Sequence, residues 1–544
     1  MIRIDDGAGE GLERTGEVGE NIQRRLVDAR DVALAQGFEG AALEACAGPA
    51  SRSLRLAGRP PLRRRIAPLL PPTAMAQSSV TARCTQHTAI ICRAASPVRR
   101  MCVMLSEPQT GEPGIVKQTR HRPRSGLPVL GALLTTTRRS RILLLGFGTL
   151  MIGDGLQSTL LGVRASLEGF PTAITGLIMS TFYIGFLAGA LYAPRFVERV
   201  GHIRVFGALA SVASASVLIH GIIVTPLAWS LLRLLSGFCL AGLYVVAESW
   251  LNDRANNRTR GQLLSVYMVV SYVGYAGGQL LLNAADPGGL ELFILTSVLI
   301  SVALVPLLLS AGPAPKFSTQ AALSLRKLYA ISPLGVVGAL ATGTASAALF
   351  GFGPVYAESS GLSVAQISFF MTAMLLGCTV LQWPIGHLSD VLDRRLVITV
   401  ISFLAAATAV AAVWISAMST IALFALMAVL GGLAIPLYSL CIAHANDYLE
   451  PEQMVAASSA LVLASGLGAI LGPITASLSM WLMGTVGFFW WLAAIHLAMG
   501  LFAVYRMTKR RAKPAQDQGR YAPSTPHGSQ VALEAAQHVM QEDQ

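Results

Sequence analysis

Three ionisable residues of this 544-residue chain lie inside long apolar segments: Asp154, Arg233 and Glu248. A charged side chain in such surroundings is costly, and it usually faces a cavity or an opposite charge. At about 1.5 Å of rise per helical residue, Asp154 lies about 18 Å and Arg233 about 25 Å from the same end of the helices. Because the long arginine side chain can span the difference, we expect Asp154 and Arg233 to pair.

Two interpretations of this pair stay open. An arginine keeps a neighbouring carboxylate ionised until the two separate, which suits a group that binds and releases a proton. A buried pair can equally be structural. Glu248, near the end of its segment, is a weaker candidate for the proton or anchors that end at the membrane interface. Tyr244, Gln279 and Asn283 either line the same cavity or hydrogen-bond between packed helices.

Twelve apolar runs must position these residues. Hydrophobic residues make up 53% of the chain and Asp, Glu, Lys and Arg only 13%, which is typical of a membrane protein. Each run has about 20 residues, enough for a helix to cross about 30 Å of hydrocarbon. The predicted fold class is therefore an all-α integral membrane protein with twelve transmembrane helices. The runs cover residues 142–163, 173–194, 203–224, 227–250, 261–284, 290–311, 329–356, 364–388, 396–416, 419–443, 454–479 and 484–507.

The second six runs repeat the first six. Offsets of 192 and 194 residues align Gly185 with Gly377 and Gly237 with Gly431. Tyr244, Asn252, Ser265, Gly274 and Gly278 likewise fall on identical residue types in the second half. Since six spans is an even number, the halves share one topology, and the sequence predicts two parallel six-helix repeats.

Basic residues indicate the orientation of the chain. Arginine and lysine gather before the first run and after the second, fourth, sixth, eighth and twelfth, and short loops rich in them stay in the cytoplasm. We expect a multi-pass protein of the cell inner (plasma) membrane with both termini cytoplasmic. The regions are a disordered basic extension (1–140), an N-terminal bundle (141–312), a cytoplasmic linker (313–328), a C-terminal bundle (329–508) and a disordered cytoplasmic tail (509–544). An alternative for the extension is a true start at Met101 or Met104.

The segment "GHLSDVLDRR", residues 386–395, concentrates charge between two apolar runs. Gly386 and Asp390 share one helix face, where the glycine permits close approach of another helix. A carboxylate at a helix C-terminus is disfavoured by the helix dipole, so it needs a partner elsewhere. The repeat predicts that partner at the start of the fifth span, near Arg260 and Gly261.

A degenerate copy of this segment, "FVERVGHIR", occupies residues 196–204. By symmetry, Glu198 should contact the start of the eleventh span near Met454. The acidic residues Asp447, Glu450 and Glu452 are candidate partners for Arg195 or Arg199. Such contacts would hold the halves together on the cytoplasmic side and break as the halves rock. The alternative is that the charges only fix topology and solvate loops. The candidate gate residues are Glu198, Arg199, Gly386, Asp390, Arg394 and Arg395.

These motifs resemble those of a known family. "GHLSDVLDRR" resembles the loop signature of the major facilitator superfamily (MFS), and "RLLSG" at 233–237 is similar to its fourth-span motif. "ESWLNDRANNRTRGQLLSVYMVVSYVGYAGGQLLLN" and "RVGHIR" resemble the YcaD-like branch, whose members are transporters without an assigned substrate. The likeness covers about residues 140 to 508. It implies the MFS fold and a secondary transporter that moves a small solute by alternating access, and the Asp154–Arg233 pair adds the expectation that transport is coupled to protons. The rival hypothesis is a membrane sensor or scaffold on the same bundle.

Other chemistry lacks a motif in this sequence. No P-loop, H-E-x-x-H or G-x-S-x-G is present, so we expect no enzyme and no ATP hydrolysis by this chain. The seven cysteines form no C-x-x-C pair and have no metal-site spacing with histidine, so we expect no metal and no cofactor. The expected partners are a small-molecule substrate, protons and the lipid bilayer, with no nucleic acid, and the expected state is a monomer.

Overall fold

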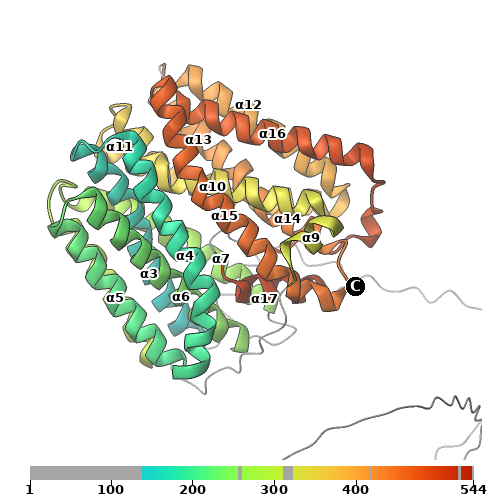
Figure 1. Ribbon diagram of the computed structural model, residues 1–544, viewed down its shortest axis with the longest axis horizontal. Coiled ribbons are helices and arrows are strands. Elements are labelled where there is room, and N and C mark those ends of the chain that lie inside the picture. The colour runs from blue at the N-terminus through green and yellow to red at the C-terminus, as the bar shows by residue number, and fades with distance from the viewer. Residues whose placement is uncertain (1–137, 255–259, 310–322, 417, 525–527, 542–544) are drawn as a thin grey trace, which may run out of the picture. The chain divides into compact units, whose positions relative to one another are not determined.

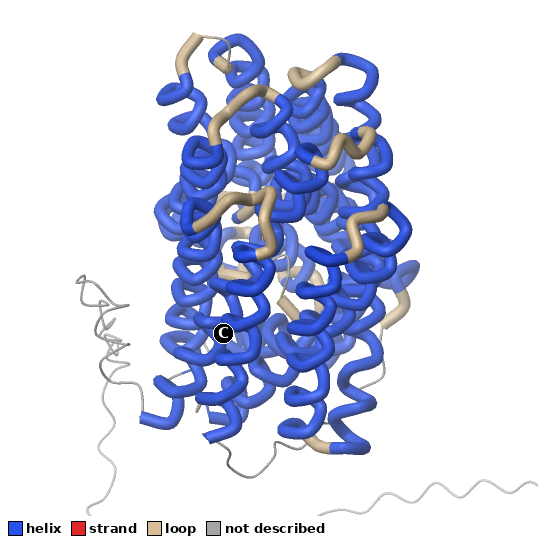
Figure 2. Tube along the Cα trace, turned by 90° about the vertical axis from the view of Figure 1, so that its left-hand side faces the viewer, coloured by secondary structure: helices blue, strands red, loops and turns tan. Residues whose placement is uncertain are grey.

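The computed structural model describes residues 138–254, 260–309, 323–416, 418–524 and 528–541. Every regular element in these ranges is a helix (Figure 2), so the all-α prediction is confirmed. The predicted extension 1–140 lies outside the described residues except for its last three positions.

Six helices form an N-terminal half, called the N-half below, and six spans form a C-terminal half, the C-half (Figure 1). The N-half contains α3 (Arg138–Leu167), α4 (Thr172–Val200), α5 (His202–Ile222), α6 (Pro226–Arg254), α7 (Arg260–Leu280) and α8 (Glu291–Leu309), with the short η2 (Leu281–Ala284) after α7. The C-half contains α10 (Pro333–Ser359), α11 (Val364–Val391), α12 (Arg394–Ile415), α13 (Thr420–Ala434), α14 (Pro436–Asn446), α15 (Pro451–Met483) and α16 (Gly487–Lys509). Outside the halves lie α9 (Leu325–Ile331), η3 (Ala515–Asp517) and α17 (Gln530–Gln541).

Eleven helical segments of the described chain are long and apolar enough to cross a membrane. The remaining predicted span is the sixth (290–311), and it corresponds to α8, whose apolar stretch Glu291–Pro306 is shorter. Helices α13 and α14 make up one span, Thr420–Asn446. Their junction lies at Ile435, directly before Pro436, which cannot donate a backbone hydrogen bond.

The two halves pack their helices in the same pattern. In the N-half α3 contacts α7 and α8, α4 contacts α6, and α5 contacts α8. The corresponding pairs of the C-half are α10 with α15 and α16, α11 with α13, and α12 with α16. Across the halves, α3 meets α10, α4 meets α15, and α7 meets α11. A two-fold axis exchanges the last two pairs, so the predicted internal repeat is present in the fold.

Aligned glycines explain part of this symmetry. A Cβ atom at Gly185 would overlap the carbonyl of Leu234, and one at Gly377 would overlap the carbonyl of Ala428. The first crossing joins α4 to α6 and the second joins α11 to α13. Close approach of helix backbones at small residues is the usual way in which membrane helices associate. The repeat noticed in the sequence therefore marks the same helix crossing in each half.

The helix ends lie on two sides of the bundle, because successive spans run in opposite directions. One side, called the basic side below, has the ends that carry Arg199, Arg394 and Lys509. The opposite side has the connections near Phe170 and Thr225. It also has the connections that follow α7, α10, α12 and α15. Both names refer only to these helix ends.

Candidate functional site

The halves contact each other directly toward the opposite side. Asn283 Nδ2 donates a hydrogen bond to Ser368 Oγ at 2.6 Å, and Ser158 Oγ donates one to the carbonyl of Phe350 at 3.2 Å. Asn283 lies on η2, where its side chain is exposed. It therefore links the halves at the end of the bundle by a hydrogen bond between η2 and α11 (Val364–Val391).

Deeper in the bundle, polar residues gather where the halves meet. Asp154 on α3 is buried, and its Oδ2 accepts a hydrogen bond from the Tyr244 hydroxyl of α6 at 3.3 Å. Tyr183 on α4 donates to the carbonyl of Ala347 in the C-half at 3.3 Å. We call Asp154, Arg233, Tyr183, Tyr244 and Tyr275 the seam cluster. Tyr244 contacts the Asp154 carboxylate within the N-half, and Tyr183 links the cluster to the C-half.

Arg233 belongs to this cluster but makes no short ion pair. Its guanidinium carbon lies 4.2 Å from the centre of the Phe182 ring, and the side chain is 3% exposed. Arg233 and Asp154 attract each other electrostatically, yet no ion pair within 4.0 Å joins them among the described residues. The two residues are thus brought into one cluster, while the expected direct pair is replaced by the contact with the aromatic ring.

Gln279 is fully buried on α7. Neither its side-chain oxygen nor its nitrogen has a hydrogen-bond partner among the described residues. A buried amide without a partner costs free energy, and it is available to hydrogen-bond with a solute or with water. The structure thus leaves the cavity interpretation of Gln279 in place.

Glu248 lies near the basic-side end of α6 and is 3% exposed. Its carboxylate accepts hydrogen bonds from the Tyr267 hydroxyl of α7 and from the hydroxyl and the backbone N–H of Ser529, the latter at 3.1 Å. Ser529 directly precedes α17. Glu248 is therefore a buried acceptor for the C-terminal end of the chain, and the interface-anchor interpretation does not describe it.

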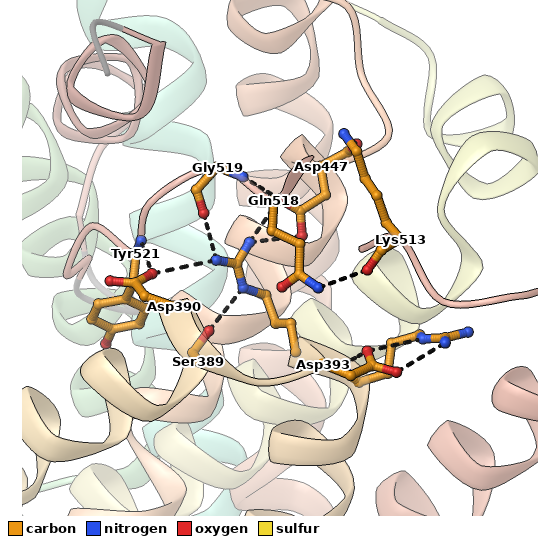
Figure 3. Close-up of polar contacts among 10 residues, drawn as sticks. Ser389, Asp390, Asp393, Asp447, Lys513, Gln518, Gly519 and Tyr521 are labelled. Carbon is orange, nitrogen blue, oxygen red and sulfur yellow. Dashed lines mark hydrogen bonds and ion pairs between the residues drawn. The ribbon is translucent and has the colours of Figure 1, made fainter. Parts of the chain in front are cut away.

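Arg394 contacts Ser389, Asp447 and Gly519, which Figure 3 labels. It is 1% exposed, and its Nη1 contacts both carboxylate oxygens of Asp447 at 2.7 Å. Its Nε donates to Ser389 Oγ at 2.8 Å, and its Nη2 donates to the carbonyl of Gly519 at 2.6 Å. Asp447 also accepts from the Gly519 backbone N–H at 3.0 Å. The suggested pairing of Asp447 with Arg195 or Arg199 is therefore wrong, since Arg394 of the same half occupies both carboxylate oxygens.

Burial raises the pKa of the Asp447 carboxyl above its ordinary range, whereas the Arg394 guanidinium acts to lower the pKa. Asp447 follows the last residue of its span. The carboxylate thus depends on Arg394 to remain ionised away from water. The pair is a buried interaction inside the C-half.

Asp390 and Gly386 contact the C-terminal end of the chain, and Figure 3 shows Asp390 beside Tyr521. Asp390 Oδ1 accepts the Tyr521 backbone N–H at 2.7 Å and lies 3.6 Å from Arg394 Nη2. A Cβ atom at Gly386 would overlap the Tyr521 ring. The sequence predicted that another helix approaches here, but the approaching group is this aromatic ring. The surroundings of Arg260 and Gly261, the expected partners, lie outside what the structure describes.

The other gate candidates lie at the surface of the basic side or near it. Arg395 pairs with Asp393 at 2.9 Å and donates to the carbonyl of Arg510 at 2.7 Å. Glu198 and Arg199 are exposed at the end of α4. The predicted contact between Glu198 and Met454 stays a prediction.

The C-terminal end of the chain is the part of the site that sequence reasoning missed. We call residues 510–524 and 528–541 the C-terminal segment. The sequence predicted a disordered tail over 509–544, but this segment folds against the bundle and ends in α17. A local signal exists in α17, which has 12 residues of which seven are apolar in an amphipathic pattern, but so short a helix does not indicate what its apolar face packs against. No group of three or more metal-binding side chains occurs among the described residues.

Comparison with known sequences identifies relatives over most of the described chain. The family model described as Major Facilitator Superfamily matches residues 142–363 and again 334–535. A protein of Escherichia fergusonii named "Uncharacterized MFS-type transporter YcaD" is 30% identical over 339 residues, which cover 62% of this chain and 87% of that protein. An uncharacterized MFS-type transporter of Enterobacter sp. (strain 638) is 31% identical over 350 residues, covering 64% of this chain and 90% of that protein.

Solved structures share the fold. The nucleoside transporter NupG aligns with a TM-score of 0.58 at 15% identity, covering 69% of this chain and 100% of NupG. A bacterial homolog of the human lysosomal transporter Spinster, in an inward-facing and occupied conformation, aligns with a TM-score of 0.54 at 16% identity, covering 73% of this chain and 100% of that one. At this level of identity the likeness concerns the fold alone.

Proposed function

The chain belongs to the major facilitator superfamily of membrane transporters, in its YcaD-like branch, and we propose that it moves a small solute by proton-coupled alternating access. It is a multi-pass integral membrane protein with the fold of that family. The proposal concerns the coupling ion and the way in which the halves move. We further propose that the basic side faces the cytoplasm of the inner membrane, because arginine-rich and lysine-rich short loops resist translocation.

The observation that carries this proposal is the seam cluster. Asp154 is buried at mid-depth, and Tyr183 joins its surroundings to Ala347 of the C-half. Tyr275 packs edge-on against Phe350 of the C-half, with ring centres 5.4 Å apart. Rocking of the halves would break both contacts and admit water to the carboxylate. A proton would then bind one Asp154 carboxylate oxygen and leave it after the return movement.

Arg233 supports the same proposal. Its buried positive charge attracts the Asp154 carboxylate, which favours the ionised acid while the two remain close. The guanidinium contacts Phe182 and makes no short ion pair with the acid, so a small displacement is enough to change their interaction. A direct bidentate ion pair would be harder to separate. This arrangement suits a carboxylate that cycles between two protonation states.

Counterflow in proteoliposomes tests whether the protein is a carrier. Vesicles loaded with one unlabelled solute from a panel of sugars, amino acids, nucleosides and drug-like cations are diluted into the labelled solute. A carrier accumulates the label transiently, because exchange through alternating access needs no net driving force. If purified, folded protein gives no counterflow with any member of a broad panel, the sensor or scaffold hypothesis gains.

A reversible lock provides the control within the same protein. Asn283 and Ser368 are hydrogen-bonded across the halves at 2.6 Å, so the variant Asn283→Cys/Ser368→Cys should cross-link on oxidation. Oxidation should stop counterflow and reduction should restore it. Each single-cysteine variant should be insensitive to both treatments. Exchange that continues in the cross-linked protein would contradict alternating access.

A further inference from the structure

The C-terminal segment crosses the basic side of the C-half and is fastened along its length. Lys513 Nζ donates to the carbonyl of Asp447 at 2.6 Å. Tyr521 contacts Asp390 and Gly386, as described above. Ser524 N–H donates to Ser439 Oγ at 2.9 Å, and Ser439 Oγ donates to the Ser524 carbonyl at 2.9 Å. Three of the residues expected to latch the two halves together, Gly386, Asp390 and Arg394, thus contact the chain's own C-terminal segment.

Helix α17 then lies between the halves. It packs against α6 and α7 of the N-half and against α15 of the C-half (Figure 1). Val531 clusters with Ala193 and Val245 of the N-half, whereas Leu533 belongs to a cluster of the C-half that includes Tyr438. Side chains two residues apart on a helix are rotated by about 200° around its axis, so they point to nearly opposite faces. The helix therefore acts as a wedge with apolar contacts on both halves.

Polar contacts fix the wedge in the same way. Toward the N-half, Ser529 donates to the Glu248 carboxylate. Toward the C-half, Gln537 Oε1 accepts from Ser458 Oγ at 2.7 Å, and its Nε2 donates to Asn446 Oδ1 at 3.1 Å. The partners of Ser529 and Gln537 are side chains of the bundle walls, and each of these partners is buried. Release of α17 would leave them facing the space between the halves.

The position of α17 conflicts with closure of the basic side. The direct hydrogen bonds between the halves lie toward the opposite side, as Asn283 and Ser158 show. At the basic side, α17 bridges the walls formed by α6 and α15. A hollow between α4, α10 and α15, lined by Tyr183, Ser346 and Ser465, is bordered by Gly528. Rocking that opens the opposite side must bring the walls of the basic side together, where α17 lies.

We propose that the C-terminal segment is an autoinhibitory plug that holds the bundle open toward the basic side and must leave before the halves can close there. The inference rests on the alternating-access function proposed above. It predicts that the plugged bundle keeps its opposite side closed, and that loss of the plug allows this side to open.

The test measures the width of the opposite side by spin labels. Thr225→Cys and Ser360→Cys place the labels on exposed positions of different halves, in the full chain with its native cysteines replaced. The plug is removed by deleting residues 511–544 or loosened by Ser529→Ala/Val531→Asp. Gln516→Asp adds the same negative charge at an exposed position of the segment and serves as control.

The full chain and the control should give one short distance, with a longer component at or below about 10%, as for a minor state. Both plug variants should raise that longer component several-fold. If the truncated chain is not recovered in folded form, the distance distribution of Ser529→Ala/Val531→Asp decides the test. A distance distribution that is the same with and without the plug would overturn the proposal.

A further variant shows whether an unchanged distance distribution means that the plug proposal is wrong or that the halves do not rock at all. A Cβ atom at Gly176 would overlap Ser477 Oγ where α4 meets α15, so Gly176→Trp forces the opposite side apart. If the truncated chain opens only with this change, the bundle can move and the plug proposal is wrong. If it does not open even then, alternating access is contradicted as well.

Discussion

Replacing Arg394 by alanine should destabilise the protein far more than the same change at the neighbouring Arg395. Arg394 is 1% exposed and holds the buried carboxylate of Asp447 with two contacts of 2.7 Å. The Arg395 side chain is 7% exposed, but it pairs with Asp393, whose side chain is 27% exposed, so water can solvate the carboxylate that removal of Arg395 would leave. Asp393 Oδ1 also accepts a hydrogen bond from the backbone N–H of residue 395 at 3.0 Å, and this bond does not depend on the arginine side chain. The two arginines thus form a matched pair at one helix end.

The magnitudes follow from what each substitution leaves behind. Removing one partner of a buried ion pair costs about 3–5 kcal/mol, because the other charge stays buried without compensation. Removing one partner of a pair that water reaches costs about 1 kcal/mol or less. The expected difference in the free energy of unfolding is therefore about 2–4 kcal/mol, or about 30-fold to 1000-fold in the equilibrium constant.

Denaturant unfolding in detergent, followed by tryptophan fluorescence, measures this difference. The double variant Arg394→Ala/Asp447→Ala should recover part of the loss, with a coupling energy on the order of 2 kcal/mol. Burial raises the pKa of Asp447 and Arg394 opposes this, so in the single variant the carboxyl is protonated more readily. The unpaired carboxylate of Asp447 destabilises the variant only while it is ionised, that is, above its pKa. The loss of unfolding free energy in Arg394→Ala should therefore shrink as the pH falls. Equal losses for the two arginines, with no coupling, would refute this reasoning.

Two further predictions concern packing and pH. Gly377→Val should lower thermal stability by at least about 1–3 kcal/mol through overlap with the Ala428 carbonyl, whereas Gly207→Val, with no atom within 4 Å of its added Cβ, should match wild type in the same melting assay. Burial raises the pKa of Glu534 on α17 to about 7, so docking of α17 is favoured below that pH and weakens as the pH rises through it. A spin label on Gln530 should gain mobility with rising pH, and Glu534→Gln should remove that dependence; a pH response unchanged in the variant would contradict it.

The spans and their symmetry could be predicted because they depend on local composition. An apolar run such as 454–479 lies within α15, and the aligned glycines at 185 and 377 mark equivalent helix crossings. The break before Pro436 was not predicted, since the apolar run continues across it. Burial of Asp154, Arg233 and Glu248 also followed from their place in apolar runs.

The partners of the charged residues could not be predicted in the same way. Asp447 lies 53 residues from Arg394 along the chain, and several basic residues share its side of the bundle. Charge alone does not distinguish a partner within one half from a partner across the halves. The C-terminal segment was missed because α17 acquires its apolar contacts only from a groove built by distant helices, α6, α7 and α15. Its own sequence is amphipathic, which indicates one apolar face but not the helices that cover it.

Solute accumulation driven by an imposed pH gradient tests the central claim most directly. For a solute that gives counterflow, wild-type proteoliposomes should concentrate it when a gradient of the correct polarity is applied. Asp154→Asn, which removes the proposed proton-binding carboxylate while preserving its size, should abolish this accumulation and retain counterflow. Accumulation that persists in Asp154→Asn with the wild-type response to the gradient would contradict the account.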